Sequence, residues 1–144
     1  MHVTKEHIEA YLSDIRTAVK AGGYQIASRY KNMDIYIDYL FTEEDAKKLL
    51  LSLRVEDFAR AVLNTHPGHS EEVLYIFGKD IKLQPRFGGE EETVPIYLKL
   101  NRLEQNKPAG PYVIVISLHK QEHTLFYPFR VCDGRTGTRT RKGA

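Results

Sequence analysis

The fold class is decided by residues 94–103, VPIYLKLNRL, and by residues 112–118, YVIVISL. In the first stretch Ile96, Leu98 and Leu100 alternate with residues that tolerate water, and this period of two predicts a strand with one buried face. The second stretch is apolar at nearly every position, which is typical of a central strand covered on both sides. Both stretches therefore predict a sheet.

Shorter strand signals lie on either side of these two stretches. Apolar residues at 73–77 and 81–83 flank the sequence GKD at residues 78–80, which predicts a hairpin with a turn at the glycine. Residues 123–130 predict another strand, and Pro128 within it indicates an edge position or a bulge. The second half of the chain is therefore expected to consist mainly of strands.

The first part of the chain favours helices. Apolar residues at three- and four-residue spacing predict a helix over residues 4–20. Thr42 begins the clearest helix, because the sequence TEED is a capping-box pattern and an apolar stripe follows it. Residues 32–40 and 56–63 are also expected to be helical, whereas residues 24–28 fit either a strand or an extended linker.

Helices that precede strands along the chain predict an α+β fold. We expect one domain at residues 1–130, in which N-terminal helices pack on one face of an antiparallel sheet of three to five strands. Residues 131–144 are expected to form a disordered tail, which is basic because it contains three arginines and a lysine. Since the formal net charge of the whole chain is only +2, the rest of the chain is nearly neutral.

Length and composition exclude several classes of protein. The 144 residues are 42% hydrophobic and 28% charged, as in an ordinary globular domain. No apolar run reaches the roughly 18 residues of a membrane span, no signal-peptide pattern occurs, and Cys132 is the single cysteine. We therefore expect a cytoplasmic protein with no membrane partner. The sequence lacks nucleotide-binding glycine motifs, a nucleophile elbow, HExxH and paired CxxC, so neither a cofactor nor a metal site is expected.

Cationic and aromatic residues mark the candidate site. They lie on the polar face of residues 94–103, just after residues 112–118, and within residues 123–130: Tyr97, Lys99, His119, Lys120, Tyr127 and Arg130. If these three strands are neighbours, the six side chains share one surface. Such a surface suits metal-independent RNA cleavage, which needs a base for the 2′-hydroxyl, an acid for the 5′-oxygen and fixed positive charge beside the phosphate.

Five short motifs follow one another in a recognisable order. They are LLLSLRVEDF (49–58), EVLYIFGKDI (72–81), IYLKL (96–100), VISLH (115–119) and FYPFR (126–130). Their order and spacing resemble the MqsR-type toxins of bacterial type II toxin–antitoxin systems, and the similarity covers most of the chain. The resemblance implies a RelE-like microbial RNase fold, an mRNA interferase activity on single-stranded mRNA, and a cognate antitoxin that neutralises it.

The resemblance also implies roles for individual positions. Tyr97 matches the family's active-site tyrosine, in a Tyr-x-Lys strand that also contains Lys99. His119 and Arg60 stand where family members have lysines, and Glu72 stands near a family glutamine. His119 keeps a group that can carry a proton and Arg60 keeps the positive charge, whereas Glu72 adds a negative charge.

The sequence thus predicts a metal-independent endoribonuclease toxin that arrests growth by cleaving mRNA. The predicted catalytic residues are His119, Tyr97, Lys99 and Arg60. The predicted RNA and phosphate contacts are Lys120, Tyr127, Arg130 and Glu72. His119 would act as the general acid or base, and Tyr97 would position or protonate the scissile group.

Other interpretations stay open at this point. Tyr97 and Lys99 also fit the solvated face of a one-sided sheet, and His119 fits a strand-end histidine with a backbone partner. The acidic run at residues 90–92 and the nearly neutral body favour a non-catalytic protein-binding module or an inactive toxin-like domain, because RNA-binding proteins are usually more basic. The same cationic residues also fit an RNase that acts on tRNA or ribosome-bound mRNA, or an enzyme that acts on a nucleotide.

Overall fold

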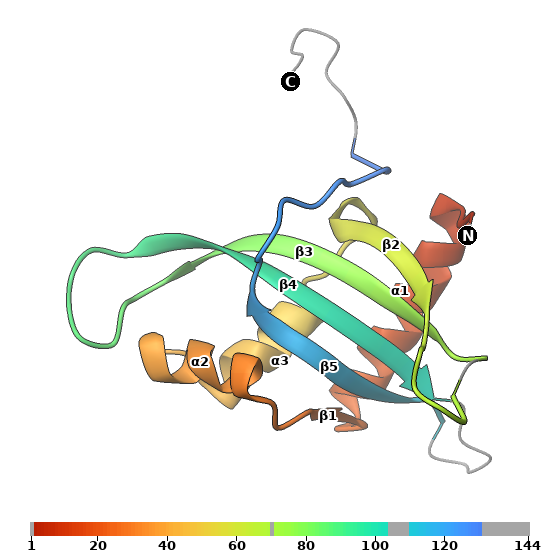
Figure 1. Ribbon diagram of the computed structural model, residues 1–144, viewed down its shortest axis with the longest axis horizontal. Coiled ribbons are helices and arrows are strands. Elements are labelled where there is room, and N and C mark those ends of the chain that lie inside the picture. Colours follow the sequence, from red (N-terminus) through yellow and green to blue (C-terminus); the bar gives the residue numbers. More distant parts are fainter. Residues whose placement is uncertain (1, 70, 104–109, 131–144) are drawn as a thin grey trace, which may run out of the picture.

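The computed structural model describes residues 2–69, 71–103 and 110–130. Within these residues the chain forms three α-helices and a five-stranded sheet, shown in Figure 1. The helices are α1 (Lys5–Lys20), α2 (Tyr30–Asp38) and α3 (Glu43–Leu51), followed by a short 3-10 turn, η1 (Val55–Asp57). The strands are β1 (Tyr24–Ile26), β2 (Phe58–Leu63), β3 (Val73–Leu83), β4 (Glu92–Leu103) and β5 (Tyr112–Lys120).

The sheet has the strand order β1-β5-β4-β3-β2. Strands β2 to β5 pair antiparallel, whereas β1 pairs parallel with β5. The α+β prediction is therefore confirmed, but the sheet is mixed rather than purely antiparallel. The difference comes from β1, the segment that fitted either a strand or a linker, which adds three residues to the edge of β5.

One face of the sheet packs on the helices. The alternation predicted for β4 is confirmed, because Ile96, Leu98 and Leu100 are fully buried in the hydrophobic core. The predicted helix starting at Thr42 is confirmed as α3, and its capping box forms because Thr42 and Asp45 exchange side-chain to backbone hydrogen bonds. These contacts leave the opposite face of the sheet clear of helices (Figure 1).

Two predictions of local structure in the middle of the chain are wrong. Residues 56–63 form no α-helix, because the chain passes from η1 into β2, whose apolar residues pair with β3. Residues 78–80 form no turn, because β3 continues through them and pairs with β4 along its whole second half. Gly78 therefore has a role other than reversing the chain.

The end of the described chain also differs from the prediction. Residues 121–130, which we call the strap, form no strand but cross the sheet in front of β4 and β3 (Figure 1). β5 is central, as predicted, yet its second face is only half-buried, so it is not covered on both sides. Residues 131–144, the predicted tail, lie outside the described residues. Among the described helices, none is long and apolar enough to cross a membrane.

Candidate functional site

Strand pairing aligns side chains from four strands in one row. Arg60 of β2 lies opposite Ile76 of β3, Ile76 lies opposite Lys99 of β4, and Lys99 lies opposite Ser117 of β5. Directly opposed residues of antiparallel strands point to the same side. These four side chains therefore share the face that the helices leave clear, which we call the open face.

A β-bulge in β5 directs His119 to this open face. Lys99 pairs with Ser117 and Leu100 pairs with Val115, so β5 has one extra residue, Ile116, at this point. Val115 points into the core, and simple alternation would send His119 into the core as well. The extra residue reverses the alternation, so that His119 lies opposite Tyr97 on the open face.

A second bulge does the same for Arg60. Phe58 pairs with Phe77, whereas Arg60 pairs with Ile76, which leaves Ala59 as the extra residue of β2. Phe58 lies in the core, and without the bulge Arg60 would follow it there. Two of the four predicted catalytic side chains thus reach the open face because their strands are irregular.

Asn32 at the start of α2 holds the bulge of β5 in place. Its amide nitrogen donates to the carbonyl oxygen of Ile116 at 3.0 Å, and its amide oxygen accepts from the backbone N–H of Leu118 at 2.9 Å. Arg29 adds a longer hydrogen bond, of 3.3 Å, to the Ile116 carbonyl. Because Asn32 is only 1% exposed, these bonds satisfy a buried backbone where the ladder is interrupted.

The open face contains a cleft with a volume of about 420 Å³. Its lining is rich in cationic and titratable side chains: Arg29, Lys31, Arg60, Tyr97, Lys99, Ser117, His119, Glu122, His123, Thr124 and Leu125. All four predicted catalytic residues belong to this set. The cleft therefore combines positive charge with groups that can carry a proton near neutral pH.

The geometry around His119 selects one tautomer. Its Nδ1 lies 2.7 Å from the carbonyl oxygen of Lys120, and a carbonyl can only accept, so Nδ1 carries the hydrogen. The Nε2 lone pair of the neutral ring is then the one available to accept a proton. The imidazole also stacks on the Tyr97 ring, with 5.1 Å between centroids and 17° between planes, which restrains its orientation.

Lys99 lies between two guanidinium groups. Partial burial, followed by the nearby positive charges of Arg29 and Arg60, lowers the pKa of its ammonium below the ordinary value. An ammonium with a lowered pKa releases its proton more readily. Arg29 is itself held in position by hydrogen bonds of 3.3 Å to the Ile116 carbonyl and the Ser117 hydroxyl.

The strap forms one wall of the cleft, and Gly78 allows it to lie close to the sheet. A Cβ atom at Gly78 would collide with the Tyr127 hydroxyl and the Leu125 side chain. Gln121 begins the strap by donating from its backbone N–H to the Pro95 carbonyl and from its side chain to the Tyr127 hydroxyl. The glycine therefore serves close approach rather than a turn.

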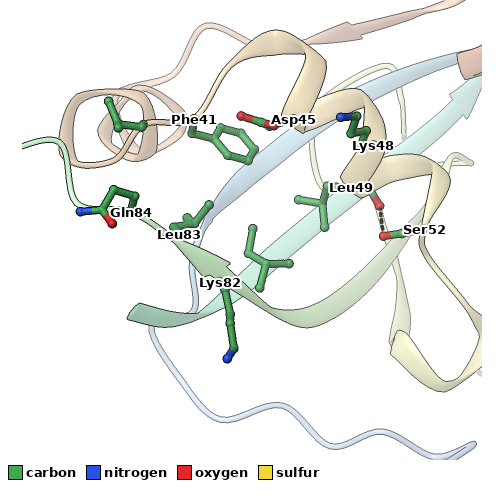
Figure 2. A pocket seen from close by; sticks show the side chains of 10 residues that line it. Phe41, Asp45, Lys48, Leu49, Ser52, Lys82, Leu83 and Gln84 are labelled. Carbon is green, nitrogen blue, oxygen red and sulfur yellow. Dashed lines mark hydrogen bonds between the residues drawn. The ribbon is translucent and has the colours of Figure 1, made fainter. Parts of the chain in front are cut away.

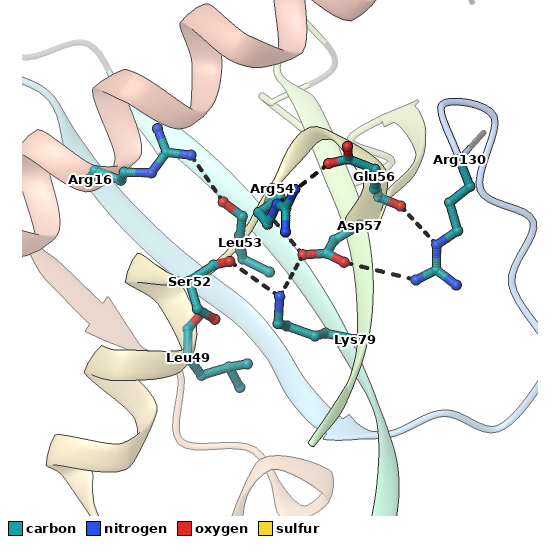
Figure 3. A network of polar contacts seen from close by, with 9 residues as sticks. All are labelled: Arg16, Leu49, Ser52, Leu53, Arg54, Glu56, Asp57, Lys79 and Arg130. Carbon is teal, nitrogen blue, oxygen red and sulfur yellow. Dashed lines mark hydrogen bonds and ion pairs between the residues drawn. The ribbon is translucent and has the colours of Figure 1, made fainter. Parts of the chain in front are cut away.

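The far end of the strap is anchored at η1, as Figure 3 shows. Arg130 donates to the Glu56 carbonyl at 3.1 Å and lies 3.8 Å from a carboxylate oxygen of Asp57. The buried Asp57 carboxylate also accepts from Lys79 at 3.0 Å and from the backbone N–H of Arg54 at 3.0 Å. Arg130, predicted as a phosphate contact, is thus engaged in holding the strap.

Three other predicted RNA contacts lie outside the cleft. Lys120 points to the helix side of the sheet, where its ammonium sits 5.2 Å from the centroid of the Tyr39 ring. Tyr127 belongs to the strap; its hydroxyl points toward Gly78, and Arg130 stacks on its ring at 3.6 Å. Glu72 lies at the other end of the sheet and accepts hydrogen bonds from Asn64 and Asn101. The prediction that six side chains share one surface is therefore wrong for Lys120, because neighbouring residues of a strand point to opposite faces.

Sequence reasoning missed several residues that line the cleft. A signal was available for Ser117, because it lies two positions before His119 on the same strand. Arg29 and Lys31 gave no comparable signal, since they reach the cleft from the start of α2. His123 belongs to residues 123–130, which were predicted to form a strand. In the structure it lies on the strap and lines the cleft.

A separate pocket of about 350 Å³ lies between α3 and the end of β3, as Figure 2 shows. Its floor is apolar, with Phe41, Leu49 and Leu83, and its rim includes Lys48 and Lys82. None of the predicted site residues lines this pocket. Its chemistry is that of a gap between packed elements rather than of a reaction centre.

The cleft contains the titratable groups His119, His123 and Glu122. Across the part of the chain that the structure describes, no group of three or more His, Cys, Asp or Glu side chains lies close enough together to hold a metal ion. Comparisons with protein-family models, with curated proteins and with solved structures found no match for this chain.

Proposed function

We propose that the protein is an endoribonuclease that cleaves single-stranded RNA in the open-face cleft without a metal ion or cofactor. The main support is a single observation: His119, with an available Nε2, lies in the same cleft as Lys99, Arg29 and Arg60. These groups supply a base, an acid and fixed positive charge, which are the three requirements of cleavage by the 2′-hydroxyl.

In the first half of the proposed reaction, His119 acts as the general base. The proton of the ribose 2′-hydroxyl moves to Nε2, and the 2′-oxygen forms a bond to the adjacent phosphorus. The hydrogen bond from Nδ1 to the Lys120 carbonyl persists as the ring becomes positively charged and stabilises that charge. Stacking on Tyr97 keeps the ring aimed at the substrate while the proton is transferred.

In the second half, the bond from phosphorus to the 5′-oxygen breaks. Lys99 gives its proton to this leaving oxygen, a role that suits its lowered pKa. Arg29 and Arg60 bind the non-bridging phosphate oxygens, where negative charge grows. The products are a 2′,3′-cyclic phosphate and a free 5′-hydroxyl.

The biological setting rests on the resemblance in the order of the sequence motifs. On that basis we propose a RelE-like, cytoplasmic toxin of a type II toxin–antitoxin system, which cleaves mRNA, arrests growth and is neutralised by a cognate antitoxin. A cleft that is open along the sheet fits single-stranded RNA, whose unpaired bases can be splayed apart.

The test uses purified protein, a long single-stranded RNA and excess EDTA, with mapping of the cut positions and of the RNA ends. Cleavage that leaves 2′,3′-cyclic phosphates, is lost in His119→Ala and is retained in His69→Ala is the expected result. His69 is an exposed histidine outside the cleft and serves as the matched control. A parallel reaction with added ribosomes detects ribosome-dependent cleavage, and intact RNA in both reactions would refute the proposal.

One observation favours the second candidate, a protein-binding module. Exposed apolar side chains gather on α2 and beside it, where Tyr30, Met33 and Ile37 share one side of the helix and Phe87 extends from the β3–β4 loop. Arg86 ties this loop to α2 by donating to the Tyr36 carbonyl. Apolar patches of this kind often mark protein contacts. Under this candidate RNA stays intact, and Ile37→Glu abolishes the protein's biological effect while His119→Ala does not.

A further inference from the structure

An ion pair crosses the mouth of the cleft. The Lys31 ammonium, at the start of α2, lies 2.9 Å from one carboxylate oxygen of Glu122 and 2.7 Å from the other. Glu122 belongs to the strap, so the pair joins two segments that are far apart in the sequence. Glu122 is the one carboxylate among the described residues that line the cleft, and it shares that lining with Arg29, Arg60, Lys99 and Lys31.

The same pair stands between two hollows. A smaller hollow, of about 170 Å³, adjoins the cleft and is lined by Asp34, Asp38 and Tyr39 among others. Lys31, His119 and Glu122 line both hollows. A bound polymer that runs from His119 into either hollow therefore meets the Lys31–Glu122 pair.

The pair is built in a way that allows it to open. Both side chains are more than half exposed, at 57% for Lys31 and 54% for Glu122. Exposed ion pairs of this kind contribute little to folding and are screened by salt. Separating Glu122 from Lys31 therefore costs the protein little.

On the side of the cleft, the charge around Glu122 is that of an anion site, whereas the smaller hollow also contains Asp34 and Asp38. The pKa of its carboxyl is lowered, first by the hydrogen bond and charge of Lys31 and then by the charges of His119 and His123. A phosphate group placed near Lys31 would meet the same ammonium group. The carboxylate thus occupies a position that suits a phosphate.

We propose that Lys31 is a second phosphate subsite, which Glu122 fills when RNA is absent. The inference rests on the proposed function in so far as it takes RNA as the ligand. When RNA binds, a phosphate adjacent to the scissile one replaces Glu122 on Lys31, beside His119. Glu122 thereby weakens binding of polyanions that do not reach both phosphate positions.

The test measures binding of a labelled single-stranded 2′-O-methyl oligoribonucleotide, which cannot be cleaved because it lacks the attacking hydroxyl. Glu122→Gln should tighten binding by about three- to tenfold at low salt, because it removes a competitor and a repulsive charge. Glu91→Gln, the same change in an exposed loop outside both hollows, should leave the affinity unchanged. The gain from Glu122→Gln should shrink as salt screens the charges.

A double-mutant cycle separates exchange at Lys31 from general repulsion. If Glu122 competes for Lys31, the gain from Glu122→Gln should largely disappear in a Lys31→Gln background. An equal gain in both backgrounds, or no gain from Glu122→Gln in wild-type protein, would overturn the proposal.

Cleavage of unmodified RNA by the same preparations reports on the proposed function separately. If wild-type protein cleaves RNA and the cycle shows no coupling, the subsite is refuted and the nuclease stands. If RNA is never cleaved but Glu122→Gln tightens binding through Lys31, the subsite stands and the nuclease fails. If no variant binds the oligonucleotide, the subsite is refuted.

Discussion

β4 and β5 present their candidate residues in different ways. In β4 strict alternation puts Ile96 and Leu98 in the core and Tyr97 and Lys99 on the open face. In β5 the alternation is broken at Ile116, and only this break directs the side chain of His119, three residues later, toward Tyr97. A regular strand can thus be read from its pattern, whereas a bulged strand changes faces where the pattern gives no notice.

The bulges of β2 and β5 lie at corresponding places relative to the cleft. In β2 the extra residue, Ala59, directly precedes Arg60, and in β5 the extra residue, Ile116, lies three positions before His119. The core therefore keeps its packing while Arg60 and His119 join Tyr97 and Lys99. Bulges are common next to active sites because they redirect a side chain without unfolding the strand.

The largest expected effect comes from the residue that the bulge of β5 redirects. His119→Ala should lower kcat/KM for RNA cleavage by about 10²- to 10⁴-fold, because it removes the general base. Circular dichroism and the urea midpoint should stay close to those of wild type. A folded variant that still cleaves at the wild-type rate would remove His119 from the mechanism.

A smaller effect, with a distinct pH dependence, is expected on the regular strand. As pH rises, Lys99 loses its proton and the rate falls. Because the pKa of Lys99 is lowered from its ordinary value of 10.5, this fall should begin at a lower pH than for an unperturbed lysine. Lys99→Arg should lower the rate by about 10- to 100-fold and abolish the alkaline fall.

A profile of kcat/KM against pH for the two proteins checks this assignment. Lys99→Arg keeps the positive charge but cannot release a proton in the accessible range, so it separates the two roles of the residue. An alkaline fall that survives in Lys99→Arg would assign the acid to another group in the cleft.

Asn32→Leu removes the amide group that holds the bulge of β5 in place. The free energy of unfolding should fall by about 1–3 kcal/mol, because the backbone groups of Ile116 and Leu118 lose buried partners. The kcat of the folded variant should also fall by about tenfold, since small displacements of a catalytic group are costly. Urea titration and steady-state kinetics measure the two effects separately.

Asn64→Ala is the matched control for this variant. Asn64 donates to Glu72 at the other end of the sheet, so its loss removes an amide hydrogen bond without touching β5. The account predicts wild-type cleavage for Asn64→Ala. Equal activity losses in the two variants would show that the bulge has no special part in placing His119.

The smallest effect is expected at Lys120, the residue next to His119 in the sequence. Lys120 follows His119 but points to the helix side of the sheet, beside Tyr39. Lys120→Ala should change kcat/KM by less than about twofold, because mutations outside the cleft remove no transition-state contact. A loss comparable to that of His119→Ala would mean that the two residues share one face and that the described register of β5 is wrong.

These contrasts show what could be predicted from the sequence. Tyr97 and Lys99 could be placed because their strand is regular, whereas His119 could be assigned to the end of its strand but not to a face. Asn32 and Arg29 could not, since Arg29 bonds to a residue 87 positions away and only the folded chain brings the two together. Residues 56–63 were misread because their apolar spacing fits a helix as well as a bulged strand.

The strap shows a different limit of sequence patterns. Its aromatic residues resemble those of a strand, but Tyr127 lies against Gly78 and Arg130 lies beside Asp57, without strand pairing. In the sequence, Gly78 fits a turn as well as a point of close approach. Only the position of the strap in the folded chain shows that it serves close approach. The contacts of Arg130 could not be predicted for the same reason, because its anchoring carboxylate lies far away in sequence.

The central claim is that RNA binds and is cleaved where the two bulges bring Arg60 and His119 beside Tyr97 and Lys99. The most direct measurement follows the NMR signals of the assigned protein while a 2′-O-methyl oligoribonucleotide is added. The account predicts saturable shifts at these four residues and little change at Glu72. Shifts centred on Glu72 or on the α3–β3 pocket, with the four cleft residues unmoved, would contradict it.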